Sequence, residues 1–244
     1  MKFLVCISQV PDTTTRISFA DGKGLNSAGV QFIINPYDEI ALTRALELKE
    51  SLGGTVTVIH VGPVAAEATL RKALAIGADD AVRINAEPLD AFFVASQIAG
   101  FVSKSPYDIV FTGRESIDFN SGQVAGMLGE LLDLPSVCVV TKIDCSASEA
   151  VLEREIDGGK EVLSSSLPLV ISAQKGMAEP RIPNMRGIMS ARTKPMQVVE
   201  PFSDAKLTQS TNYELPPAKQ ACKMIAGDKM DELVNLLHTE AKVI

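Results

Sequence analysis

Short apolar runs alternate with longer amphipathic segments over the first part of this 244-residue chain. The first run, Lys2–Ser8, is apolar at most positions, as parallel strands covered on both faces are. The alternation predicts an α/β fold in which a parallel sheet carries helices on both faces. The later runs, with segments of helical periodicity between them, are Thr55–Val61, Ala81–Ile84, Ile109–Phe111 and Ser136–Ile143.

Start signals mark the helices between these runs. Asn35 and Pro36 suit the N-cap and the first helical position, and Asp38 follows three residues after the cap. Gln31–Ile34, just before this helix, is a further candidate for a short strand. The next two predicted helices are Ala65–Ile76 and Leu89–Ser103.

The stretch Tyr107–Asp133 combines a short strand, a glycine-bearing loop and the start of a helix. The loop begins at Thr112-Gly113, and Ser121 is expected to cap the helix that follows. The first N–H groups of a helix have no partner inside it and the helix dipole is positive there, so this arrangement suits a phosphate group. An ordinary connection between strand and helix is the alternative that composition leaves open.

The alternation ends after Ile143. Ala150–Ile156 and Lys160–Ser165 flank the turn Asp157-Gly158-Gly159, and we expect them to pair as a β-hairpin. Leu169–Ser172 is predicted to be one further strand.

Gln174–Pro195 carries three prolines and is predicted to be a long loop without secondary structure of its own. Its only acid is Glu179, although the whole chain is acidic. This local change of sign favours a docking surface for acidic partners, with a solvated loop as the alternative. The basic residues of the segment are Lys175, Arg181, Arg186, Arg192 and Lys194.

The remaining residues are predicted to form an arm and a helix. Pro201–Ala218 has few apolar residues and reads as a linker. Asp228 is expected to cap the last helix, whose apolar stripe requires a surface to pack on, either in its own domain or on a partner subunit. The stripe consists of Met230, Leu233, Val234 and Leu237.

Composition and charge exclude several classes of protein. A net charge of −7 argues against non-specific binding of nucleic acid. No apolar run is long enough to predict a membrane span, and the first residues lack the pattern of a signal peptide. From these two absences we predict a cytoplasmic or organelle-matrix location. The four cysteines and two histidines have no metal-ligand spacing, so we predict reduced thiols and no metal site.

The sequence lacks the common catalytic motifs, among them the phosphate-binding GxxxxGK[ST] loop, GxSxG and HExxH. Three connections are expected to converge at the carboxyl ends of the strands, and a fourth, Val61-Gly62-Pro63, flanks them. The three are Cys6–Gln9, Asn35–Asp38 and Gly113–Val124. These features predict a nucleotide-binding domain without catalytic side chains.

Motifs along nearly the whole chain resemble the beta subunit of electron transfer flavoproteins. They include NPYDEIALTRALELKE, ATLRKALAIGADDAVRI, GRESIDFNSGQVAGMLGELLDLP, EREIDGGKE and EPRIPNMRGIMSARTKP. The resemblance implies a Rossmann-like fold of the adenine nucleotide alpha hydrolase type. It also implies a non-enzymatic subunit that pairs with an alpha subunit holding a redox-active FAD. The heterodimer is expected to carry electrons from flavin-linked, acyl-CoA-type dehydrogenases to a quinone oxidoreductase or a similar acceptor, in the bacterial cytoplasm or the mitochondrial matrix.

The same resemblance implies a structural AMP in the beta subunit, contacted at Cys6 and Val61 through the backbone. Glu155 matches a residue near the flavin at the subunit interface. The remaining positions carried over to the AMP site are Asn35, Pro36, Tyr37, Asp38, Gly113, Asp118, Phe119, Asn120, Ser121, Gly122, Gln123 and Val124.

Residues 173–195 match the recognition loop of the family, with Met185 at an anchoring position. The other partner-binding residues that we expect there are Arg181, Arg186, Ile188 and Met189. The implied division of the chain is a nucleotide-binding domain at 1–195 and, at 196–244, an arm and helix that pack on the alpha subunit.

Three other functions remain as alternatives. In the electron-bifurcating branch of the family a second FAD replaces AMP, and Phe119 argues against this because its ring is expected to crowd a flavin. An ATP-cleaving ligase or pyrophosphatase would require a Ser/Gly-rich loop after the first strand, which Ser8–Asp12 does not provide. A free-standing nucleotide sensor leaves the basic loop and the last helix unexplained.

Overall fold

The computed structural model describes residues 1–20, 24–219 and 221–244. The chain forms two compact units: the first comprises Met1–Ile17 and Asn26–Thr211, and the second Ser18–Leu25 and Asn212–Ile244. In the described part of the chain, we found no helix with the length and apolar character needed to cross a membrane.

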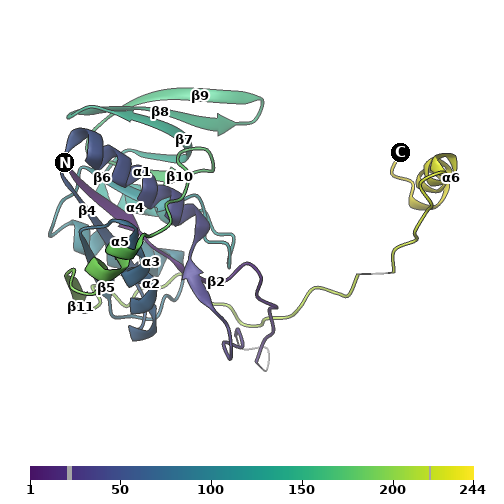
Figure 1. Cartoon of the computed structure of the whole chain (residues 1–244), viewed down its shortest axis with the longest axis horizontal. Helices are drawn as coiled ribbons and strands as arrows, with labels where there is room; N and C mark the ends of the chain where they lie inside the picture. Colours follow the sequence, from purple (N-terminus) through teal and green to yellow (C-terminus); the bar gives the residue numbers. More distant parts are fainter. Residues whose placement is uncertain (21–23, 220) are drawn as a thin grey trace. The chain divides into compact units, whose positions relative to one another are not determined.

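A nine-stranded sheet organises the first unit, in the order β11-β5-β4-β1-β6-β10-β7-β8-β9 (Figure 1). Neighbouring strands from β11 to β7 are parallel, whereas β7, β8 and β9 pair antiparallel. The α/β fold predicted from the alternation of apolar runs is confirmed. The strands are β1 (Lys2–Cys6), β4 (Thr55–Val61), β5 (Asp80–Ile84), β6 (Ile109–Gly113), β7 (Ser136–Cys145), β8 (Glu149–Ile156), β9 (Gly159–Ser166), β10 (Leu169–Ala173) and β11 (Met196–Val199).

Two hydrophobic cores cover the two faces of the sheet. Phe3 and Val5 of β1 pack in one core with α1 (Pro36–Leu52) and α2 (Glu67–Ile76). Leu4 and Cys6, which point the other way, pack in the second core with α3 (Ala91–Val102) and α4 (Val124–Leu132). Alternate residues of a central strand are therefore buried on both sides, which explains why the run Lys2–Ser8 is almost continuously apolar.

One short strand lies outside the main sheet. β3 (Phe32–Ile34) pairs antiparallel with β2 (Gln9–Pro11) to form a separate two-stranded sheet. The segment Gln31–Ile34 was thus predicted correctly as a strand but is not part of the parallel layer. Similarly, the helix expected from Ala65 begins as a 3-10 turn, η1 (Val64–Ala66), before α2.

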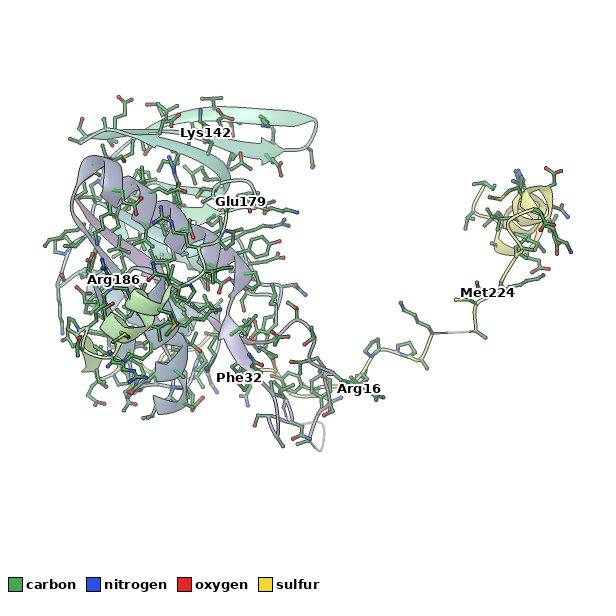
Figure 2. The ribbon with its side chains drawn as sticks, viewed as in Figure 1. Arg16, Phe32, Lys142, Glu179, Arg186 and Met224 are labelled. Atoms are coloured by element: carbon green, nitrogen blue, oxygen red, sulfur yellow. The ribbon has the colours of Figure 1, made fainter. Side chains whose placement is uncertain are left out.

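The hairpin predicted after Ile143 is confirmed as β8 and β9, which form one edge of the sheet (Figure 1). The prediction that residues 174–195 lack secondary structure is wrong, because they contain the short helix α5 (Met185–Ala191). Asn184 caps this helix, since its side chain accepts a hydrogen bond from the N–H of Gly187 at 2.8 Å. Figure 2 shows Arg186 on α5 and Glu179 in the loop before it.

The first unit extends past the expected domain boundary at residue 195. β11 pairs in parallel with β5 along its whole length. Beyond it, Gln97 of α3 accepts a hydrogen bond from the N–H of Phe202 at 2.6 Å. Residues 196–211 therefore belong with the sheet, and the separate C-terminal part begins at Asn212.

The second unit is small, and its described residues contain no buried side chain. The ring of Phe19 lies 5.5 Å from that of Tyr213. Its helix α6 (Met230–Leu236) continues into a π-helical turn, Leu237–Ala241. The N-cap position is Lys229, so the expectation that Asp228 caps this helix is wrong. In the apolar stripe of this segment Met230 and Val234 are exposed and Leu233 and Leu237 are half-buried, because the unit's described residues form no buried core.

Candidate functional site

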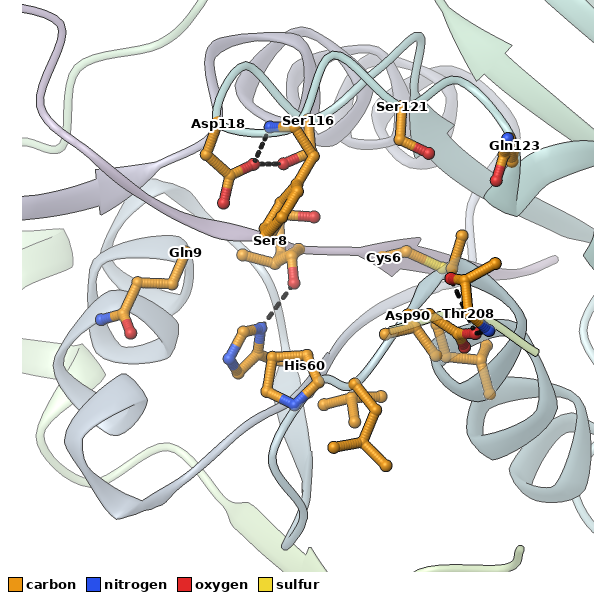
Figure 3. Close-up of a pocket in the computed structure, with 18 of the residues that line it drawn as sticks. Cys6, Ser8, Gln9, His60, Asp90, Ser116, Asp118, Ser121, Gln123 and Thr208 are labelled. Carbon is orange, nitrogen blue, oxygen red and sulfur yellow. Dashed lines mark hydrogen bonds between the residues drawn. The ribbon is translucent and has the colours of Figure 1, made fainter. Parts of the chain in front are cut away.

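A pocket of about 310 Å³ lies where β1 and β4 end, beside the loop that leads from β6 to α4. Cys6 and Val61, the last residues of β1 and β4, form part of its wall. This is the edge at which open α/β sheets bind their ligands. Figure 3 labels four of the predicted residues in this pocket, Cys6, Asp118, Ser121 and Gln123. Among the positions carried over from the resemblance, those that line the pocket are Cys6, Val61, Asp118, Phe119, Ser121 and Gln123. Ile7, Ser8, Gln9 and Ser116, which lie in the connections predicted to converge here, also line it.

Asp38 joins three chain connections beneath this pocket. Its buried carboxylate accepts hydrogen bonds from the N–H of Ser8 at 2.6 Å and from the N–H of Gly113 at 2.9 Å. The side-chain amide of Asn35 donates to the same carboxylate at 3.0 Å and to the carbonyl oxygen of Glu115 at 2.8 Å. The ends of β1 and β6 and the start of α1 are thereby fixed relative to one another.

This geometry changes the roles expected for Asn35 and Asp38. Asn35 occupies the N-cap position of α1, yet its side chain makes no capping hydrogen bond. Both residues are buried and neither lines the pocket. They hold the loops that form the site.

Burial raises the pKa of Asp38 to about 7, against the opposing effect of the hydrogen bonds from Ser8, Asn35 and Gly113. Burial also raises the pKa of the Cys6 thiol, and the charge of Asp38 acts in the same direction. Cys6 is therefore a protonated thiol that packs in the pocket wall, not a nucleophile.

The loop after β6 folds back on itself. Ser116 and Ser121 form an isolated antiparallel bridge, and Asn120 between them has a positive φ of 49°. The hydroxyl of Ser116 donates to the carboxylate of Asp118 (Figure 3). Phe119 is 66% exposed although it lines the pocket, so its ring lies at the mouth.

The helix after this loop starts later than predicted. α4 begins at Val124, with Gln123 in the N-cap position and no side-chain cap, so the expectation that Ser121 caps the helix is wrong. Ser121 is held in the bridge with Ser116 instead. The first N–H groups of α4 therefore have no side-chain acceptor and remain available to an anion beside Gln123.

His60 of β4 contributes a buried imidazole to the pocket. Its Nδ1 lies 2.7 Å from the carbonyl oxygen of Ile7, which only accepts hydrogen bonds, so Nδ1 carries the proton. Burial lowers the pKa of His60, and the charge of Arg83 lowers it further, whereas the bond to Ile7 raises it. The ring is thus held neutral and fixed in orientation.

A further wall was not predicted from the sequence. It comes from the start of α3 and from residues far along the chain, Thr208 and Ser210. Asp90 caps α3 by accepting from the N–H of Phe93 at 2.7 Å. Nothing in the local sequence indicated that residues after 200 return to this helix. The unpredicted residues of this wall are Pro88, Leu89, Asp90, Ala91, Val94, Ile98, Thr208 and Ser210.

Several carried-over positions lie outside the pocket lining. Gly113 is near Asp38, as described above, and Glu155 is exposed on β8 in the hairpin at the edge of the sheet. The other positions that do not line the pocket are Pro36, Tyr37, Asn120, Gly122 and Val124.

Two of the five basic residues in 174–195 make hydrogen bonds or ion pairs with other parts of the chain. Arg181 forms a two-pronged ion pair with Glu50, at 2.6 and 2.8 Å. This pairing raises the pKa of Arg181. The ammonium of Lys194 donates to the carbonyl oxygens of Leu74 and Ala78, at 3.0 and 2.5 Å.

What α5 exposes is mainly apolar. Met185 is 74% exposed, and Ile188 and Met189 of the same helix are also exposed. Arg186 lies among them on α5. The surface of the segment is therefore a short methionine-rich helix beside a few free charges, less basic than its sequence suggested.

Gly113 leaves no room for a side chain, so Gly113→Ala is expected to disrupt the network around Asp38. An added Cβ would lie 2.2 Å from Oδ1 of Asp38 and 3.0 Å from its backbone nitrogen. We expect a loss of about 1–3 kcal/mol in the free energy of unfolding, measured with urea. The control is Gly126→Ala in α4, where the space is open. It should be neutral or stabilising by about 0.5–1 kcal/mol. Equal stability of the two variants would contradict the prediction.

His60 is expected to make stability depend on pH. Because its pKa is lower in the folded state than its ordinary value of 6.5, the unfolded chain binds more protons below that pH. The stabilising contribution is therefore present above about pH 6.5 and is lost as the pH falls through the folded-state pKa. His60→Asn keeps a donor for Ile7 but does not titrate. The difference in unfolding free energy between the unaltered chain and this variant should shrink on acidification, and a constant difference would disprove the assignment.

Comparisons with known proteins agree with this architecture. Residues 24–203 match the family described as "Electron transfer flavoprotein domain". Over the full length of both chains, the protein is 38% identical to "Electron transfer flavoprotein subunit beta" of Bacillus subtilis. It is likewise 33% identical over both full lengths to "Electron transfer flavoprotein subunit beta, mitochondrial" of Oryza sativa subsp. japonica.

A third relative has a different name. The chain is 32% identical to "Acryloyl-CoA reductase electron transfer subunit gamma" of Anaerotignum propionicum, over 97% of this chain and 98% of that protein. All three relatives are named as electron transfer subunits. With a match of this length to the family and these identities along the whole chain, the protein belongs to the beta-subunit family of electron transfer flavoproteins.

Proposed function

We propose that the pocket at the ends of β1 and β4 binds AMP. The observation that carries this proposal is the convergence of Cys6, Val61 and the loop before α4 on one cavity. Its walls are mainly apolar, with a few hydroxyl and amide groups, as in many small-molecule sites. The uncapped start of α4 beside Gln123 suits the phosphate of a mononucleotide.

The size of the cavity favours a mononucleotide over FAD. Its volume of about 310 Å³ lies at the lower end of the range for ligand pockets, roughly 300–1,000 Å³. Phe119 stands at the mouth, where the larger cofactor would have to extend. The residues present therefore fit AMP better than a second flavin.

AMP in this site has a structural role. The pocket offers a protonated thiol, a neutral imidazole fixed to Ile7, and carboxylates that are already hydrogen-bonded. None of these groups is arranged as a nucleophile with its base. We infer that the subunit is a carrier and not an enzyme. Bound AMP contacts the ends of β1 and β4 and the loop before α4, and so holds these parts of the chain together.

In this proposal the redox chemistry comes from an FAD held mainly by an alpha subunit, which accepts and donates electrons. The residues of this chain orient and shield that group at the interface, with Glu155 on β8 close to it. The apolar stripe of α6, which has no core within its own unit, packs on the alpha subunit. We place the heterodimer in the bacterial cytoplasm or the mitochondrial matrix.

The segment 173–195 docks the electron donors and acceptors, which we take to be acyl-CoA-type dehydrogenases and a quinone oxidoreductase. Met185, Ile188 and Met189 provide an adaptable apolar contact, and flexible methionines suit a surface that accepts several partners. Arg186 adds charge to this contact. Arg181 is committed to Glu50, so its part is to hold the segment in place.

The second candidate is a subunit of an electron-bifurcating complex with FAD in the pocket. The relative from Anaerotignum propionicum is named as an electron transfer subunit of an acryloyl-CoA reductase, so a similar chain works as part of a larger complex, as a bifurcating subunit would. The small cavity argues against it.

The ligand content of the purified heterodimer tests the proposal. We expect acid release and mass spectrometry to find one FAD and one AMP for each heterodimer. Two FAD and no AMP would establish the bifurcating alternative. A chain that purifies without an alpha subunit, with a nucleotide bound, would instead indicate a free-standing sensor.

Met185→Ala is expected to slow flavin reduction by a dehydrogenase without loss of bound flavin. The side chain is 74% exposed on α5, so its removal leaves the fold intact while it removes an anchor for a partner. Stopped-flow measurement of flavin reduction gives the rate. The matched control is Val64→Ala, which is 64% exposed on η1 outside the segment, and should leave the rate unchanged. An unchanged rate in Met185→Ala would refute this role.

A further inference from the structure

Residues after β11 run along α3 and are held to it at several points. The ring of Phe202 packs on Gly100, where a Cβ would lie 2.6 Å from it. The side chain of Gln97 accepts from the N–H of Phe202 at 2.6 Å and donates to the carbonyl oxygen of Ser203 at 2.5 Å. We call residues 202–210 the strap.

Asp90 holds the far end of the strap. One carboxylate oxygen, Oδ1, caps α3 through the N–H of Phe93. The other, Oδ2, accepts from the N–H of Leu207 at 2.7 Å, from the N–H of Thr208 at 2.6 Å and from the hydroxyl of Thr208 at 3.2 Å. Burial alone would raise the pKa of Asp90, but these hydrogen bonds lower it overall, so the group is an ionised acceptor.

The strap brings two hydroxyl side chains to the pocket. Thr208 and Ser210 line it together with Leu89 and Val94 of the α3 end. Figure 3 shows the pair of Asp90 and Thr208 on the side of the pocket away from Ser116 and Asp118. An ionised carboxylate beside this wall disfavours a phosphate there, whereas the start of α4 favours one.

We propose that Asp90 is a positioning residue that holds the strap as a wall of the nucleotide pocket, and that Thr208 and Ser210 contact the ribose of the bound mononucleotide. The hydroxyl of Thr208 donates to Asp90, which leaves its oxygen free to accept from a ribose hydroxyl. The inference rests on the proposed function, because it requires a nucleotide in this pocket. Asp90, Thr208 and Ser210 would then help to retain the nucleotide, although none of them belongs to the site positions expected from the sequence.

Two variants test separately whether Asp90 holds the strap and whether Thr208 contacts the ribose. Asp90→Asn keeps the oxygen that caps α3, since asparagine is an equally good N-cap, but replaces the oxygen that receives Leu207 and Thr208. Thr208→Val removes the hydroxyl and keeps the N–H that Asp90 holds. Far-UV circular dichroism checks that α3 and the rest of the fold persist in both.

The experiment uses the heterodimer with the alpha subunit, loaded with radiolabelled AMP and chased with unlabelled AMP, together with hydrogen–deuterium exchange of residues 202–210. For Asp90→Asn we expect faster exchange in the strap and release of AMP faster by roughly tenfold. For Thr208→Val we expect unchanged exchange and release faster by about threefold to tenfold.

Each other outcome overturns a defined part of the proposal. Unchanged exchange in Asp90→Asn overturns the anchor. Faster exchange with unchanged release overturns the role of the strap in holding AMP, and unchanged release in Thr208→Val overturns the ribose contact. If the unaltered heterodimer takes up no AMP, the proposed function fails and the retention role fails with it, while the exchange data still decide whether Asp90 anchors the strap.

Discussion

The carboxylate of Asp38 is the interaction on which the site depends. It is buried at the point where β1, β6 and α1 meet, and it receives N–H donors from Ser8, Gly113 and Asn35. A buried carboxylate without such donors is costly, so the three connections must adopt the geometry that supplies them. The close approach of Gly113, where no Cβ fits, follows from this requirement.

Around Asp38, the residues that support the loops differ from the residues that form the surface of the pocket. Asn35 and Asp38 are buried under the pocket, whereas Cys6, Val61 and the loop that carries Phe119 form its surface. Outside the pocket, α5 exposes methionines while Arg181 and Lys194 are used to fasten the segment to α1 and α2. The proposed function therefore rests on a rigid sheet edge for the nucleotide and on one short helix for partner docking.

Periodicity and capping signals predicted the parallel sheet, its helices and the hairpin, because these depend on local pattern and burial. The same reasoning failed for α5, whose signal, Asn184 followed by seven helical residues, is short. It also failed for the wall made by Thr208 and Ser210. Their placement depends on Gln97 and Asp90, more than 100 positions earlier, and no local pattern encodes such a contact. Resemblance identified six of the residues that line the pocket but could not separate them from Asn35 and Asp38, which support it.

The walls of the pocket come from both ends of the first unit. Cys6 lies near its first residue, Met1, and Ser210 lies next to its last residue, Thr211. During synthesis β1, β4 and β6 can assemble early, but the cavity acquires its last side only when residues 202–210 have left the ribosome. A nascent chain therefore presents an open and incomplete site. In the proposed function, capture of the nucleotide is therefore a late event in synthesis, because the last wall of the pocket and α6 leave the ribosome close together in time.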